Sequence, residues 1–348
     1  MKNKLMLLLA FLFIFQANQV FAQGCDEGDD KAKEENTEAK AEEPKIKVFG
    51  FLQAQYDYDV FSDANTFKFK RARVGVTGAV TKDFTYYMVL ETAPLLSANG
   101  SVYLLDAFIT YHNSDWVKLS LGQFKQPFGL EVNTACNGLT TIERSMISDQ
   151  LVAPQRDLGL MWLGGNKDTK LRYAIALQNG SGISTVDNNK KKDVSGRISY
   201  KPFDFLTVGG SYRYGFPTNN DDNRTTYGAD AEVKYKNFKL VGEYIYDEGS
   251  YNAAVSGGCG GAPSTLGPRR QGAYVTASYL TKWNIEPVYK YEYFDTCLDY
   301  SKNMNEIVTM GVNYYINSAT RLQLNYQYKV ESYEIDNDAF LVQLQVKF

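Results

Sequence analysis

The sequence has little of what catalytic sites are usually built from. Among its 348 residues there are one His, four Cys and nine Pro. A single His disfavours catalytic dyads and His-rich metal sites, and no glycine motif of a phosphate loop or dinucleotide site is present. After the N-terminal stretch no segment is long and apolar enough for a membrane-spanning helix, which needs about 20 residues. The sequence therefore excludes a bundle of membrane helices, and we expect no cofactor, no metal and no enzymatic activity.

What the chain does have is an abundance of aromatic residues, with 26 Tyr and 20 Phe. Its mean hydropathy is nevertheless only −0.36, and its formal charge is −3. A charge this small gives no reason to expect a nucleic-acid partner. The problem set by the composition is a chain that is polar on average and yet rich in Tyr.

The N-terminus has the layout of a secretory signal peptide. Lys2 and Lys4 precede an apolar stretch over residues 5–15, and small residues up to Ala22 suit a cleavage site. We expect residues 1–22 to be the signal peptide and residues 23–45, which carry a net charge of −5, to be an acidic flexible linker. Cys25 follows a degraded lipobox, so both lipidation and ordinary cleavage stay open.

The remaining residues, 46–348, are neutral in sum, but their charge changes sign along the chain. Residues 47–215 carry a net charge of +4, and residues 216–348 carry −4. From residue 46 onward, stretches of about ten residues alternate apolar with polar side chains, which is the period of strands with two unlike faces. The alternation predicts sixteen strands, at approximately 48–58, 67–80, 84–92, 102–112, 116–125, 157–164, 169–178, 194–201, 206–214, 226–235, 238–247, 271–280, 285–294, 305–316, 319–330 and 339–348.

The connections between these strands fall into two classes. Those after even-numbered strands are short, such as Lys236-Asn237, and those after odd-numbered strands are longer. This layout is typical of an outer-membrane β-barrel, whereas a soluble sandwich would not place Tyr so heavily near strand ends. Amphipathic Tyr rings suit the membrane interface, and the final Phe348 lies on the apolar face of the last strand, as is usual in such barrels. We therefore expect an all-β fold, a transmembrane antiparallel β-barrel of 16 strands spanning residues 46–348, in the outer membrane of a Gram-negative bacterium.

The longest connection, residues 126–156 after the fifth strand, is apolar enough to pack against a wall. A barrel of this size encloses an aqueous channel that side chains cannot fill, so a segment must narrow it to give selectivity. Pro127 and Gly129 suit a sharp inward bend. We expect a short helix over residues 140–151, with Thr140 or Thr141 as N-cap.

Several motifs resemble the phosphate-selective porin O and P family. They are Phe69-Lys70-Arg71-Ala72-Arg73-Val74-Gly75-Val76, Leu121-Gly122-Gln123-Phe124-Lys125-Gln126-Pro127-Phe128-Gly129-Leu130-Glu131, Glu143-Arg144-Ser145 and Pro154-Gln155-Arg156-Asp157-Leu158-Gly159. The resemblance covers roughly residues 48–215. It implies a 16-stranded, usually trimeric channel whose loop after the fifth strand folds inward and narrows a lumen lined by Arg and Lys.

The faces of the strands give a candidate set of pore-lining, anion-attracting residues. It comprises Arg71, Arg73, Lys125, Arg144, Arg156, Arg197 and Arg213. Rings of one charge sign favour counter-ions at a constriction. Acidic residues share the region, however, and the barrel sums to zero, so phosphate specificity is doubtful and a general or weakly anion-preferring pore is the safer hypothesis.

Two further features concern the long loops. Cys259 and Cys297 fall on loops of the same side, where an exported chain could form a disulfide, and two free thiols are the alternative. Arg269-Arg270 could meet anionic lipopolysaccharide, or they could be an ordinary solvated pair.

The leading hypothesis is a passive outer-membrane porin for small hydrophilic or anionic solutes. A barrel-anchored adhesin or receptor without conductance is the alternative, and a barrel enzyme is disfavoured because His112 has no identifiable Ser or Asp partner. Outer-membrane lipid and lipopolysaccharide surround such a barrel.

Overall fold

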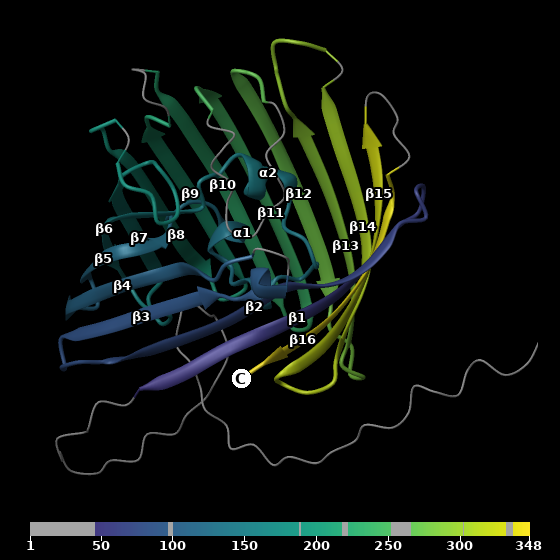
Figure 1. Cartoon of the computed structure of the whole chain (residues 1–348), viewed down its shortest axis with the longest axis horizontal. Helices are drawn as coiled ribbons and strands as arrows, with labels where there is room; N and C mark the ends of the chain where they lie inside the picture. Colours follow the sequence, from purple (N-terminus) through teal and green to yellow (C-terminus); the bar gives the residue numbers. More distant parts are fainter. Residues whose placement is uncertain are drawn as a thin grey trace, which may run out of the picture.

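The computed structural model describes residues 46–96, 100–187, 189–217, 222–251, 266–301, 303–331 and 337–348. In these residues sixteen antiparallel strands form one closed barrel, because β1 pairs with β2 on one side and with β16 on the other. The predicted 16-stranded barrel is confirmed (Figure 1). The strands are β1 (Lys47–Asp59), β2 (Asn65–Ala79), β3 (Phe84–Glu91), β4 (Tyr103–Ser114), β5 (Val117–Lys125), β6 (Arg156–Gly164), β7 (Leu171–Gln178), β8 (Asp193–Phe203), β9 (Leu206–Gly215), β10 (Arg224–Tyr235), β11 (Phe238–Gly249), β12 (Arg269–Tyr279), β13 (Ile285–Asp295), β14 (Met304–Tyr315), β15 (Thr320–Glu331) and β16 (Ala339–Lys347).

The burial pattern of the strands is the inverse of that in a soluble protein. In β15 the polar Gln323 and Asn325 point inward and are buried, whereas Tyr326 and Tyr328 point outward and are exposed. Closure of the sheet pairs the backbone groups of every strand with its neighbours and leaves no open edge, as hydrocarbon requires. Among the described residues, no helix is long and apolar enough to cross a membrane.

The two classes of connection are confirmed except for the connection after β1. Turns after even-numbered strands are short, and Lys236 adopts a φ of 53° in the two-residue turn between β10 and β11. The connection after β1, residues 60–64, is shorter than expected because both flanking strands extend beyond their predicted ends. A 3₁₀ helix, η1 (Ala93–Leu96), which the alternation did not predict, follows β3.

The long connection between β5 and β6, residues 126–155, lies inside the barrel, and we call it the inward loop (Figure 1). It contains α1 (Leu130–Asn133), the 3₁₀ helix η2 (Cys136–Gly138) and α2 (Met146–Gln150). The predicted helix over residues 140–151 was therefore wrong in its start. Ser145 caps α2 by accepting a hydrogen bond from the Ser148 backbone N–H, whereas the Thr141 hydroxyl donates to the carbonyl oxygen of Glu143.

Candidate constriction of the barrel lumen

The inward loop crosses the lumen and packs against the wall opposite its origin. It leaves β5 through a bend at Gly129, whose φ of 71° is in the region that favours glycine. Its apolar residues then join inward-facing residues of β11, β12 and β13 in one buried cluster. The cluster comprises Phe128, Val132, Ile147, Leu151 and Val152 of the loop with Val241, Ile245, Tyr274 and Phe294 of the strands. The prediction that this loop packs against a wall is confirmed.

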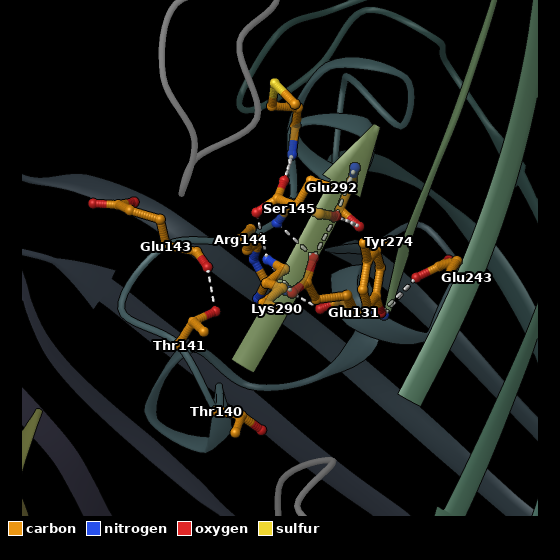
Figure 2. Close-up of polar contacts among 12 residues, drawn as sticks. Glu131, Thr140, Thr141, Glu143, Arg144, Ser145, Glu243, Tyr274, Lys290 and Glu292 are labelled. Carbon is orange, nitrogen blue, oxygen red and sulfur yellow. Dashed lines mark hydrogen bonds and ion pairs between the residues drawn. The ribbon is translucent and has the colours of Figure 1, made fainter. Parts of the chain in front are cut away.

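A buried group of charges fixes the same part of the loop (Figure 2). Lys290 of β13 lies 3.3 Å from a carboxylate oxygen of Glu131 and 3.1 Å from Glu292. Ser145 donates to Glu131 through its backbone N–H at 2.7 Å and its hydroxyl at 2.6 Å, and the backbone N–H of Met146 donates to Glu292 at 2.8 Å. Burial would raise the pKa of Glu131, but Lys290, Arg144 and the Ser145 hydrogen bonds outweigh it and lower that pKa. Glu131 is therefore held ionised.

The start of α1 is capped by the barrel wall. The first N–H groups of a helix have no partner within the helix, and Gly129, the N-cap residue, has no side chain to supply one. Glu243 of β11 accepts from the backbone N–H of Leu130 at 3.0 Å and of Glu131 at 3.2 Å, and also from the Tyr274 hydroxyl at 3.1 Å. A strand residue more than 110 positions away thus fixes where the helix begins.

Two buried arginines hold the far end of the loop. Arg213 of β9 and Arg224 of β10 donate to the carbonyl oxygen of Ala153 at 2.8 and 2.7 Å. Arg224 also donates to the carbonyl oxygen of Leu151 at 2.6 Å. We call residues 128–133 and 144–153, which these contacts attach to β9–β13, the base of the loop.

The middle of the loop, residues 134–143, is attached differently, and we call it the lobe. It lies against inward-facing side-chain amides of β14, β15, β16 and β1, which we call the amide wall. Backbone groups of the lobe make five neutral hydrogen bonds with that wall: Gln53 to the Cys136 oxygen at 3.2 Å, Gln345 to the Asn137 oxygen at 3.1 Å, Asn313 and Gln323 to the Thr140 oxygen at 2.9 and 3.3 Å, and the Ile142 N–H to Asn325 at 2.8 Å. At the edge of the lobe Glu143 pairs with Lys70 at 2.8 Å.

A small hollow with a volume of about 40 Å³ separates the lobe from β10, β11 and β12. Its lining alternates hydroxyl, apolar and charged side chains, and it includes Thr134, Thr140, Thr141, Thr276, Leu130, Leu139, Val241, Tyr274, Glu131, Glu232 and Lys239. Glu232 lies 3.0 Å from Lys234 and 3.7 Å from Lys239. The charged groups at the hollow are therefore of both signs.

Four of the seven predicted anion-attracting residues are in buried ion pairs. Arg73 pairs with Glu91 at 2.7 Å, Arg156 with Asp106 at 2.9 Å and Arg213 with Asp193 at 2.6 Å. Arg197 donates to Asp230 at 2.8 Å. None of these four borders the hollow. Each positive charge is thus offset by a neighbouring carboxylate.

Of the other three predicted residues, Lys125 and Arg144 brace the loop, and Arg71 bonds to the neighbouring strand β1. Arg71 donates to Gln53 at 2.8 Å, and Lys125 donates to the carbonyl oxygens of Val132 and Thr134 at 3.0 and 3.2 Å. Arg144 donates to the backbone carbonyl oxygen of Thr134 at 2.6 Å and to that of Glu131. The seven predicted residues thus lie around the inward loop, and their side chains bind other groups of the protein.

The sequence reasoning missed Lys290, which pairs with Glu131 of the loop, and Lys239, the basic residue at the hollow. Both lie on inward positions of alternating strands, which is the signal that could have found them. The partner of Arg73 could also have been predicted from the sequence, because Glu91 stands directly opposite it in the β2–β3 hairpin.

The remaining predicted features are the cysteines and the pair Arg269-Arg270. Cys297 is buried and forms no disulfide within the described part of the chain, while Cys259 and Cys25 lie outside the described residues. Arg270 is buried and pairs with Asp247, so it cannot meet lipopolysaccharide, whereas Arg269 is exposed and pairs with Asp299. Within the described ranges, no group of three or more His, Cys, Asp or Glu side chains could hold a metal ion.

Comparisons with known proteins agree with this architecture. The family model of phosphate-selective porin O and P matches residues 46–257. Porin O of Pseudomonas aeruginosa is 26% identical over 182 residues, a match that covers 49% of this chain and 41% of Porin O. The chain thus matches less than half the length of this relative.

Solved porins share the fold at low identity. OmpF of Salmonella typhi, solved in complex with daunomycin, is 15% identical, with a TM-score of 0.68 over 87% of this chain and 97% of OmpF. An anion-selective porin from Comamonas acidovorans is 12% identical, with a TM-score of 0.64 over 88% of this chain and 100% of that porin. The family match extends over more than half of the chain, on a porin fold. The chain therefore belongs to the phosphate-selective porin O and P family, a family of non-enzymatic barrels in the outer membrane of Gram-negative bacteria.

Proposed function

We propose that the protein is a passive channel for small hydrophilic solutes. The observation that carries this is the inward loop, which is anchored across the lumen of a closed barrel and still leaves a hollow lined by hydroxyl and charged groups. A protein that used its barrel only as an anchor would have no need for such a constriction.

We further propose that its preference for anions is weak and that it does not select phosphate. The family and the anion-selective porin of similar fold support an anion preference. Against a strong one, four of the seven candidate basic residues have carboxylate partners, and selectivity depends on the summed charge. Paired charges contribute little field at a distance.

Planar-bilayer recordings test both statements. We expect stepwise conductance, and a reversal potential in a KCl gradient that shifts only slightly toward that of chloride. Replacing Arg73 by Ala should move it toward cation preference, since Glu91 loses its partner, and Arg71→Ala and Arg144→Ala should do the same. A Glu91→Gln/Arg73→Ala double variant is the matched control, with a reversal potential near that of the wild type.

Two outcomes would contradict the proposal. A folded barrel without conductance would favour the adhesin or receptor alternative. Strong cation selectivity of the wild type, or unchanged selectivity in all three single variants, would mean that these arginines do not set the field of the pore.

We also propose that residues 1–22 are removed on export, that residues 23–45 are a flexible tether, and that the barrel assembles as a homotrimer in lipid and lipopolysaccharide. Support comes from the signal pattern and from the family; OmpT of Vibrio cholerae, a porin of similar fold, has been solved in a trimer form. N-terminal sequencing of the mature protein and its mass in detergent by light scattering test these points. An acylated Cys25 or a monomeric mass would contradict them.

A further inference from the structure

The amide wall is built from eight buried side-chain amides on four successive strands. They are Asn313, Gln323, Asn325, Gln327, Gln343, Gln345, Gln53 and Gln55. Four of them stand directly opposite one another across the sheet, as Asn313, Gln323, Gln343 and Gln55 on β14, β15, β16 and β1. We call these four the amide row. Such a row is neutral, and it can both donate and accept hydrogen bonds.

Hydrogen bonds fix which way the two central amides point. Gln323 donates through Nε2 to Asn313 Oδ1 at 2.9 Å and to the Thr140 oxygen. Gln343 donates through Nε2 to Gln55 Oε1 at 2.7 Å, and Gln55 in turn donates to Asp57 at 2.6 Å. Rotating either amide by half a turn would set oxygen against oxygen. These hydrogen bonds therefore fix the orientation of the Gln323 and Gln343 amides and with it the positions of their Oε1 atoms.

These two oxygens accept no hydrogen bond from the described residues, although both side chains are completely buried. Buried acceptors without donors are rare in folded proteins and call for an explanation. Their two residues stand directly opposite each other on neighbouring strands, where Cβ atoms are about 5 Å apart. A molecule that satisfied both would need two hydrogen-bond donors a few ångströms apart.

The lobe covers this surface with contacts that are weak one by one. Its carbonyl oxygens at Cys136, Asn137 and Thr140 accept from the wall as solute oxygens would. On its other side the lobe borders the hollow, to which Thr134, Thr140 and Thr141 contribute. The base stays held by its ion pairs and its apolar cluster.

We propose that the amide row is a binding track for neutral solutes that carry several hydroxyl groups, such as sugars, and that the lobe occupies it in this structure. A hydroxyl donates to Gln323 Oε1 or Gln343 Oε1 and accepts from an amide N–H that the lobe has released. A fully ionised anion without donors cannot satisfy those oxygens. The inference rests on the proposed channel function and adds a solute class to it.

Binding of maltose, with sulfate as the anion that has no donors, tests the track. We expect maltose to interrupt the single-channel current of the wild type and sulfate to leave it unblocked. Gln323→Leu/Gln343→Leu removes both acceptors, and two lost hydrogen bonds should weaken maltose binding roughly 10- to 30-fold. Gln178→Leu, which removes another buried amide on the inward face of β7, should leave maltose affinity unchanged.

Titration calorimetry of the detergent-solubilised protein gives the maltose affinity without any current. If the wild type does not conduct but binds maltose through these amides, the channel proposal fails and the binding track stands. If it conducts and maltose neither blocks the current nor releases heat, the binding track is wrong. It is equally wrong if the double variant conducts more and keeps its maltose affinity, because the two amides would then only hold the lobe.

Discussion

Two walls of the same lumen hold the inward loop by different chemistry. The inward faces of β8–β13, which we call the charged wall, present ion pairs such as Lys290 with Glu131 and Glu292. The amide wall of β14, β15, β16 and β1 presents neutral side chains that bond to the backbone of the lobe. The base is therefore held largely by buried ion pairs, whereas the lobe is held largely by neutral hydrogen bonds, with the Glu143–Lys70 pair at its edge.

The difference shows how a barrel can combine a rigid constriction with a movable one. Removing one partner of a buried ion pair leaves an uncompensated charge and costs about 3–5 kcal/mol. A neutral hydrogen bond contributes about 0.5–1.5 kcal/mol. The charged wall thus determines whether the loop stays inside the barrel, and the amide wall determines how often the lobe leaves its place.

The largest effect is expected for Lys290→Met. Lys290 is 1% exposed, and without it two buried carboxylates, Glu131 and Glu292, face each other. The free energy of unfolding in urea should fall by about 3–5 kcal/mol, and a protease should cut the inward loop far faster than in the wild type.

Lys329→Met, on an inward position of β15, is the control for loss of a lumenal lysine, and it should change neither quantity much. Equal losses in the two variants would mean that Lys290 does not anchor the loop.

The fold could be read from the sequence almost completely, because each strand carries its own two-residue period. Membrane barrels make this signal clear, since lipid and water lie on the two sides of every strand. The inward loop was harder. Its helix α2 starts only at Met146, after the Ser145 cap. The residues before it make long-range contacts, such as that of the Ile142 N–H with Asn325, a residue 183 positions away, and no local pattern contains them.

The anion-attracting role of the seven candidate residues stays a prediction, and the structure shows what their side chains contact. All seven basic residues lie around the inward loop, yet Arg156 pairs with Asp106, 50 positions earlier, and Arg213 with Asp193. Face alternation places a charge in the lumen and says nothing about the carboxylate beside it. Strand register supplies that partner. Asp193 and Arg213 lie on the paired strands β8 and β9, whereas Arg156 of β6 reaches Asp106 of β4 across β5.

A smaller effect is expected for the pH dependence of stability that comes from the base of the inward loop. Because the pKa of Glu131 lies below its ordinary value of 4.5, its ionised form stabilises the folded loop above that pH, and this stabilisation is lost as the pH falls through the lowered pKa. Urea midpoints of the wild type and Glu131→Gln should differ by a constant amount at neutral pH and converge below about pH 4.5. The gap should be smaller than for Lys290→Met, since Glu292 still pairs with Lys290 at 3.1 Å. A gap that widens in acid would contradict the anchoring role of the Glu131 carboxylate.

The smallest effect belongs to the lobe, and Cys136, which is 2% exposed, reports on it. In a background with the other three cysteines replaced by Ser, a maleimide reaches Cys136 only when the lobe leaves the amide wall. Asn325→Leu removes one hydrogen bond to the lobe, worth about 1 kcal/mol, so labelling should be roughly fivefold faster. Gln327→Leu is the matched control, because Gln327 shares strand and face with Asn325 and makes no hydrogen bond to the lobe in the described structure. If both variants label at the wild-type rate, the lobe is held as firmly as the base, and the contrast between the two walls is wrong.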